Sequence, residues 1–119
     1  MDTAARPRSK FTTDDMLEIV SKIHSHIYGG NTIRVLDDEG ERWIVFADIC
    51  KALGYKNPNH ESKKVRQPEK KKLEIGLKNT LAVCINQRGL LSFTLFSNKR
   101  ETAAFRRWAD TEIFGNGGD

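Results

Sequence analysis

Two apolar-patterned stretches constrain the fold of this chain, and they lie on either side of its most basic segment. The first, residues 45–58, has the spacing of a short amphipathic helix that stops at Gly54. The second, residues 85–108, carries two apolar-periodic runs that break at Ser97. Because a chain of 119 residues supports one hydrophobic core, both stretches are expected to belong to a single domain that displays the basic segment between them.

The other patterns predict an α+β fold. Alternating apolar residues on either side of an acidic, glycine-containing turn at 37–40 predict one β-hairpin, and alternation along 73–85 predicts a second. The turn Asn57-Pro58-Asn59 can open a further helix at 59–66, and the apolar residues predict helices at 89–96 and 101–113. The 89–96 helix is apolar on almost every side, so we expect it to be largely buried. The expected architecture is a small, mainly antiparallel sheet with short helices.

An additional amphipathic helix is predicted within residues 12–30, ahead of these elements. Its start fits a capping box at 12–15, and His24 and His26 would point to different faces of it. Its apolar face would consist of Met16, Val20, Ile23 and Ile27. We expect this face to pack on its own domain, with dimerisation through it as the alternative. Residues 1–11 and 115–119 have the composition of flexible tails.

Several classes of protein are disfavoured by what the sequence lacks. No run of about 18 apolar residues predicts a membrane span, and residues 1–10 lack the apolar core of a secretory signal. Cys50 and Cys84 are isolated within apolar patterns, which indicates buried thiols in a reducing compartment, the cytoplasm. Neither metal-ligand spacing nor a nucleophile beside a base is present. We therefore expect no enzyme activity, metal or other cofactor.

The net charge of +4 is unevenly distributed along the chain. Residues 1–50 hold six Lys or Arg and nine Asp or Glu, for a charge of −3. Residues 51–72 hold eight and two, for +6, and residues 73–119 hold six and five, for +1. A basic stripe of this kind is typical of surfaces that bind phosphate backbones, although a solvated loop would have the same composition.

The basic segment contains most of the candidate residues for nucleic-acid binding. The helix expected at 47–53, the turn at 54–58 and the helix at 59–66 have the outline of a helix-turn-helix, with a turn longer than usual. Lysines there would anchor phosphates, and polar side chains would read base edges. The exposed cations of the later helices would extend this surface. The set is Lys51, Lys56, Asn57, Asn59, His60, Lys63, Lys64, Arg66, Lys70, Lys71, Lys72, Lys99, Arg100, Arg106 and Arg107.

The two stretches together resemble the Bro-N domain, the N-terminal module of baculovirus Bro proteins and many phage antirepressors. The first half of the resemblance is residues 46–58, which read FADICKALGYKNP. The second half consists of Asn86, Gly89-Leu90, Ser92, the turn Ser97-Asn98-Lys99 and Phe105-Arg106-Arg107-Trp108. The similarity covers roughly residues 31–114 and implies a phage- or prophage-type transcriptional regulator that binds DNA, in a bacterial or infected host cell. Family members usually continue into a second domain, so the chain is either a stand-alone regulator or an N-terminal piece.

The alternative function is an antirepressor that sequesters a repressor protein without contacting DNA. Such a module needs an apolar patch with a charged rim. The candidates lie on the face of the predicted N-terminal helix and at the acidic hairpin tip, and they are Met16, Val20, Ile23, Ile27, Asp37, Asp38, Glu39 and Glu41. The sequence leaves the choice between DNA and a repressor open.

Overall fold

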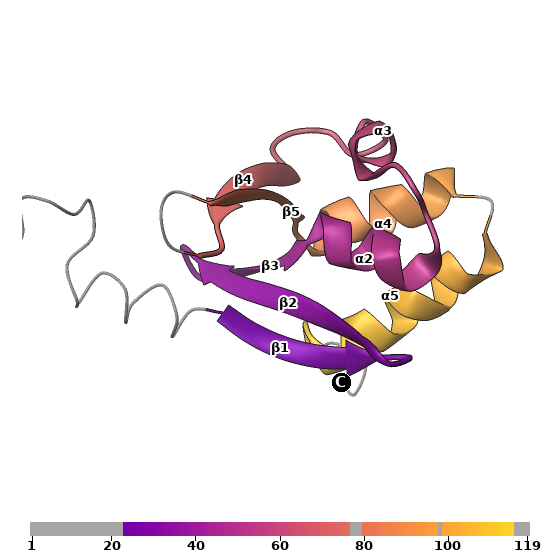
Figure 1. Ribbon diagram of the computed structural model, residues 1–119, viewed down its shortest axis with the longest axis horizontal. Coiled ribbons are helices and arrows are strands. Elements are labelled where there is room, and N and C mark those ends of the chain that lie inside the picture. The colour runs from indigo at the N-terminus through magenta and orange to yellow at the C-terminus, as the bar shows by residue number, and fades with distance from the viewer. Residues whose placement is uncertain (1–22, 77–79, 98, 116–119) are drawn as a thin grey trace, which may run out of the picture.

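The computed structural model describes residues 23–76, 80–97 and 99–115, which form an antiparallel five-stranded sheet in the order β1-β2-β3-β5-β4. Helices α2, α4 and α5 pack on one face of the sheet, and α3 lies beyond them near β4 (Figure 1). The α+β prediction is confirmed. The elements are β1 (Ile23–Tyr28), β2 (Asn31–Asp38), β3 (Glu41–Val45), α2 (Phe46–Leu53), α3 (Pro58–Ser62), β4 (Lys70–Glu74), β5 (Leu81–Ile85), α4 (Gln87–Phe96) and α5 (Arg100–Glu112).

Both predicted hairpins are present. Strands β2 and β3 are joined by Glu39 and Gly40, whose φ angles of 52° and 78° are the positive values that a two-residue hairpin turn of type I′ requires. Strands β4 and β5 pair from Lys70 with Ile85 to Glu74 with Leu81. Pairing of β3 with β5 joins the two hairpins into one sheet.

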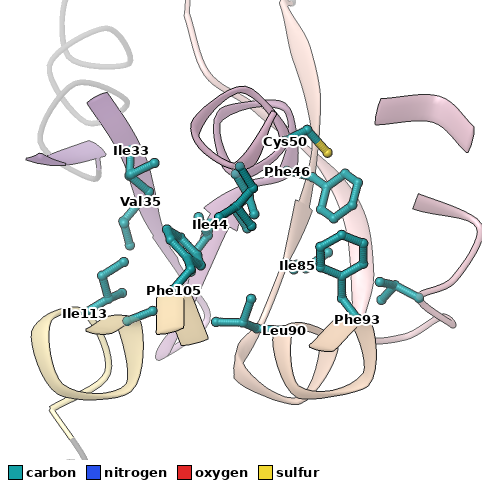
Figure 2. Packing of buried hydrophobic residues seen from close by; sticks show 14 residues of the cluster. Ile33, Val35, Ile44, Phe46, Cys50, Ile85, Leu90, Phe93, Phe105 and Ile113 are labelled. Atoms are coloured by element: carbon teal, nitrogen blue, oxygen red, sulfur yellow. The ribbon is translucent and has the colours of Figure 1, made fainter. Parts of the chain in front are cut away.

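The main core lies between the sheet and the helices (Figure 2). Phe46 and Phe93 meet edge to face at its centre, with ring centroids 5.1 Å apart. Burial of each large side chain stabilises the fold by roughly 1.5–3 kcal/mol. The main contributors are Ile33, Val35, Ile44 and Ile85 from the sheet, and Phe46, Ile49, Cys50, Leu90, Phe93, Phe105 and Ile113 from the helices and the residue after α5.

A second, smaller cluster lies on the opposite face of the sheet and contains Leu36, Trp43, Val45 and Cys84. Lys71 covers it, because its Nζ atom lies 4.5 Å from the Trp43 ring centroid and 2.6 Å from Oδ2 of Asp38. Asp38 belongs to β2 and Lys71 to β4, and two other strands separate these in the sheet. The sheet is therefore curled around the second cluster.

The prediction of a helix was wrong for residues 23–27, which form strand β1. Cross-strand pairing places His24 opposite Val35 and His26 opposite Ile33, so both histidines share the helix-covered face instead of diverging. Ile27, expected on the apolar face of a helix, is 64% exposed. Residues 12–22, which include Met16 and Val20, lie outside the described residues.

Helix α4 was predicted to be largely buried, and this was also wrong. Leu90 and Phe93 enter the core, but Leu91, Leu95 and Phe96 are 45%, 74% and 63% exposed. The helix packs on the sheet and α5 through one side only, so its remaining apolar residues face outward. Among the described residues, no helix is long and apolar enough to cross a membrane.

Candidate nucleic-acid interface

Helix α3 is the first structural feature of the basic segment. The Asn57 side chain caps it by accepting a hydrogen bond from the His60 N–H at 3.2 Å, and Pro58 occupies its first turn. The helix ends at Ser62, earlier than predicted, and its five residues span only about 7.5 Å. A recognition helix needs more length than this, so the helix-turn-helix interpretation was wrong for its second helix.

The connection from α3 to β4 is anchored by Val65, which is 1% exposed. It packs closely on the start of α4, because a Cβ atom added at Gly89 would lie 2.6 Å from the Glu69 carbonyl oxygen and 3.2 Å from Val65 Cγ1. The backbone N–H of Asn86 donates to the same carbonyl at 3.2 Å. Anchored in this way, the connection displays Lys63 and Arg66 to solvent on either side of Val65.

Strand β4 is tied to α3 by Lys70, whose Nζ atom donates to the Ser62 carbonyl oxygen at 2.7 Å. A hollow of about 340 Å³ lies at this junction. Polar and cationic side chains dominate its lining, which consists of Asn59, Ser62, Gln67, Lys70, Lys71, Lys72 and Val83. Four of these residues, Asn59, Lys70, Lys71 and Lys72, belong to the set predicted from the sequence. Ser62 and Gln67 lie in the same basic segment but outside that set, and Val83 lies outside the segment.

The cations of α3, β4 and the connection between them differ in whether their side chains already have a partner within the domain. Lys64 pairs with Glu61 at 2.7 Å, and Lys70 and Lys71 bind Ser62 and Asp38. Lys63, Arg66 and Lys72 are exposed, and their side chains make no hydrogen bond or ion pair with another described residue. Their charges are free to meet phosphates. We call the exposed Asn59, Lys63, Arg66 and Lys72, with Lys70 between them, the α3–β4 basic surface.

A second basic group surrounds Tyr55, which sequence reasoning did not single out. The Nζ atoms of Lys64 and Lys99 lie 6.0 Å and 4.4 Å from the Tyr55 ring centroid. Lys99 also donates to the Leu53 carbonyl oxygen at 3.1 Å and so caps the end of α2. Tyr55 therefore links the surface of α3 to the turn between α4 and α5.

The remaining predicted residues are scattered. Asn57 caps α3. Four other predicted residues are exposed and lie outside the hollow, namely His60, Lys51, Lys56 and Arg100. Arg106 pairs with Asp110 at 2.9 Å on α5, and Arg107 is exposed on the same helix. Figure 1 shows α5 and α3 at opposite sides of the domain, with α2 and α4 between them. The α5 arginines are thus separate from the α3–β4 basic surface.

The acidic residues proposed for a protein partner are largely engaged within the domain. Asp37 pairs with His24 at 2.8 Å and with Arg42 at 3.4 Å. Asp38 binds Lys71, and Glu41 accepts a hydrogen bond from the Asn86 side chain at 3.0 Å. Glu39 is exposed at the turn. These acids therefore do not form a free acidic patch in the described part of the chain.

The two thiols are buried in the two apolar clusters. Burial raises the pKa of Cys50 and of Cys84 to about 12, so both are neutral thiols at physiological pH and poor nucleophiles. Within the described ranges, no group of three or more His, Cys, Asp or Glu residues could hold a metal ion.

Comparison with protein families gave one match. The family described as "BRO family, N-terminal domain" matches residues 32–115, which is more than half of the chain and runs from β2 to the end of α5. The α3–β4 basic surface lies inside this range, whereas β1 precedes it. Searches of curated proteins and of solved structures gave no match.

Proposed function

The chain belongs to the BRO family and carries its N-terminal domain, and from this membership we propose that it is a transcriptional regulator of the phage or prophage type that binds DNA through the α3–β4 basic surface. The observation that carries the proposal is the set of three exposed cations, Lys63, Arg66 and Lys72, whose side chains form no hydrogen bond or ion pair with another described residue. Lys72 lines the polar hollow, and Lys63 and Arg66 lie in the connection that joins α3 to β4. Cations without internal partners can neutralise phosphates without first breaking an ion pair.

The charge of the segment supports the same proposal. Residues 51–72 carry +6, and the acids within them, Glu61 and Glu69, are engaged with Lys64 and Ser92. Asn59 and Gln67 add amide groups at the hollow, which can hydrogen-bond base edges or sugar oxygens. A five-residue α3 favours contact by several short segments over insertion of one long helix into the major groove.

The test is the affinity of the full chain for duplex DNA, measured by fluorescence anisotropy at several salt concentrations. Changing Lys63, Arg66 and Lys72 to Ala should weaken binding across unrelated sequences. It should also reduce the slope of log K against log salt by up to about 2.7, since each neutralised phosphate contributes about 0.9. The matched control changes Arg106 and Arg107 to Ala on α5 and should retain the parental slope.

An unchanged affinity of the triple variant at about 50 mM salt would reject this surface as the binding site. A repressor-sequestering function has a different signature in the same assay. The chain alone would leave the DNA signal unchanged, and its addition would abolish the signal of a repressor bound to its operator.

A further inference from the structure

The outer edge of strand β1 is the feature that the proposed function does not use. β1 and β4 are the two terminal strands of the described sheet (Figure 1), and such an edge presents backbone groups that can pair with another strand. Charged residues, prolines and bulges usually protect it. β4 begins with three lysines. β1 reads IHSHIY, holds no Lys, Arg, Asp, Glu or Pro, and pairs with β2 without a bulge from residue 23 to residue 28. The edge of β1 therefore lacks the protection that β4 has.

The turn after β1 determines which backbone groups point toward this edge. It consists of Gly29 and Gly30, whose φ angles of 56° and 84° fit a two-residue hairpin turn. Such a turn lies between the two residues of a hydrogen-bonded pair, here Tyr28 and Asn31, and these pairs recur at every second residue. The even-numbered residues of β1 therefore bond to β2 through their backbone groups, and the odd-numbered residues direct theirs outward.

The outward residues, Ile23, Ser25 and Ile27, read the same in both directions about Ser25. Two antiparallel copies of β1 centred on Ser25 would place each Ile23 opposite the Ile27 of the other copy. Each opposite pair would exchange two backbone hydrogen bonds. A register centred on His26 would leave Ile23 without an opposite residue in β1, so the register centred on Ser25 uses the whole edge.

The side chains suit the same register. Ile27 is 64% exposed, and Ile23 packs against the smaller cluster. The two lie on one face of the sheet, because they are four residues apart, so each Ile23 would cover the Ile27 of the other copy. On the opposite face, His24 would meet His26. Both already pair with acids of their own domain at 2.8 Å and 3.7 Å, so the contact brings together no unpaired charge.

Other pairings of the sheet edges fit less well. Two β4 edges would bring their lysines together, and like charges opposite each other are destabilising. Pairing of β1 with β4 would be heterologous and would leave one edge open on each terminal copy, so copies would add without limit. Pairing of β1 with β1 closes on itself and leaves only the lysine-protected edge exposed.

We propose that two copies of this chain pair through their β1 strands, antiparallel around a two-fold axis at Ser25, and form one continuous sheet. The contact is isologous, because each copy contributes the same strand. One strand pair buries less area than a standard stable interface, so the dimer should dissociate with a constant between about 1 µM and about 1 mM. This inference does not depend on DNA binding, since β1 and the strand of the α3–β4 basic surface are opposite edges of the sheet.

Sedimentation equilibrium of the full chain tests the pairing with charges placed at the axis. The parent should shift from monomer to dimer across this concentration range. Ser25→Lys and Ser25→Glu each put like charges opposite one another, so each variant alone should dimerise roughly tenfold more weakly. A mixture of the two should recover the association, because opposite charges then meet. Leu81→Lys is the matched control, since Leu81 is 55% exposed on β5, away from β1, and it should dimerise as the parent does. Ser25 is exposed as well, so all these variants should unfold at the parental midpoint.

Disulfide cross-linking tests the register. Ser25→Cys should form an intermolecular disulfide under mild oxidation, because opposite residues of a hydrogen-bonded pair have Cα atoms about 5.5 Å apart. Ile27→Cys should not, because the two copies of residue 27 lie roughly 13 Å apart along the strands. The natural cysteines are buried and should not interfere.

Amide hydrogen exchange identifies what occupies the edge. The amides of Ile23, Ser25 and Ile27 should exchange rapidly in dilute protein and slowly at concentrations at which the dimer forms. The amides of His24 and His26 serve as the internal control, since they bond to β2 and should exchange slowly in both.

Any of four results would overturn the proposal. The first is a chain that stays monomeric at about 1 mM, the upper limit expected for a contact of this size. The second is a mixture of the two charged variants that associates no better than either alone. The third is a variant with cysteine at position 27 that cross-links as efficiently as the one at position 25, which would indicate parallel pairing. The fourth is slow exchange of the outward amides in the monomer, which would show that another segment of the same chain occupies the edge.

Discussion

Asp48 joins the beginning of α2 to strand β2 through three hydrogen bonds with Arg34. Its carboxylate accepts from the Arg34 backbone N–H at 2.9 Å and from Nε and Nη2 at 2.8 Å each. The Asp48 side chain is 12% exposed, and its hydrogen bond raises the pKa of Arg34. This Asp belongs to the sequence pattern that suggested the family, and its role in the fold is to hold the first helix against the sheet.

We predict that Asp48→Asn destabilises the domain by about 1.5–3 kcal/mol, because neutral amide contacts replace charge-assisted hydrogen bonds at a largely buried site. Urea unfolding measures the change. Asp110→Asn is the control, since the Asp110 side chain is twice as exposed, at 24%, and pairs with Arg106 of its own helix, with one further hydrogen bond from Gln87. It should cost less than about 1 kcal/mol. An equal decrease in the free energy of unfolding for the two variants would contradict the prediction.

The buried thiols predict a dependence of stability on alkaline pH. An unfolded thiol ionises near about pH 8.5, whereas burial raises the pKa of Cys50 and Cys84 to about 12 in the folded protein. Between these values the unfolded state binds fewer protons, so the free energy of unfolding falls as pH rises. The two buried, neutral thiols make their full contribution to the free energy of unfolding below about pH 8.5 and lose it as the pH rises towards about 12.

Because lysines and tyrosines also titrate in this range, the measurement compares the parent with a variant in which both cysteines are Ala. The free energy of unfolding from pH 8 to pH 11 should decline more steeply in the parent, by at most about 1.4 kcal/mol per pH unit for each thiol. Parallel curves for the two proteins would show that the thiols do not contribute.

At the scale of elements, the approach of the α3–β4 connection to α4 depends on a glycine within a helix. Replacing a helical Gly by Ala ordinarily stabilises by about 0.5–1 kcal/mol. At Gly89 the new methyl group would lie 2.6 Å from a backbone carbonyl oxygen, that of Glu69. The connection would have to move, and it carries two cations of the α3–β4 basic surface.

Gly89→Ala should therefore destabilise the domain by about 1–3 kcal/mol and reduce DNA affinity without removing a charge. Thermal unfolding and anisotropy measure the two effects. Gly76→Ala is the matched control, since its nearest neighbour would be the Thr80 Cβ at 3.8 Å, an ordinary contact. A Gly89→Ala variant at least as stable as the parent would show that the connection adapts freely.

The sequence predicted most elements because their signals are local. The Asp-Glu-Gly turn, the stop at Gly54 and the apolar spacing of α5 were read correctly, and all three were confirmed. Strand β1 was misread because its inward-facing residues are His24, His26 and Tyr28. The rings of His26 and Tyr28 lie against Trp108 of α5, with centroids 6.3 Å and 4.9 Å away, and His24 pairs with Asp37 of β2. A hydrophobicity pattern instead emphasises the isoleucines, one of which faces outward.

The candidate site was predicted less well than the fold. Sequence identified the basic segment but could not separate free cations from engaged ones, because the partners of Lys70 and Lys71 are a backbone carbonyl and a side chain on a distant strand. Gly89 in the first turn of an apolar helix was the one local signal of the close contact with residues 65–69. It becomes informative only once the neighbouring segment is known.

At the scale of the whole molecule, the charges of opposite sign are combined across the fold. The acidic hairpin formed by β2 and β3 is neutralised in part by Lys71 of β4, which pairs with Asp38, and by Arg42 of the hairpin itself, which pairs with Asp37. The net positive charge that remains free is therefore concentrated elsewhere, at the α3–β4 basic surface and on the outer sides of α2 and α5.

The curled sheet separates two tryptophans that can serve as spectroscopic probes. Trp43 lies beneath the Lys71 ammonium group in the smaller cluster, and Trp108 lies against Tyr28 beside the main core. Variants that retain one indole each, Trp108→Phe and Trp43→Phe, would report fluorescence from one layer at a time. Coincident denaturation curves from the two would indicate that both layers melt as a single cooperative unit. An earlier transition at Trp43 would mean that the curl opens while the helical layer is still intact, and that the strand carrying Lys72 is released before the scaffold is lost.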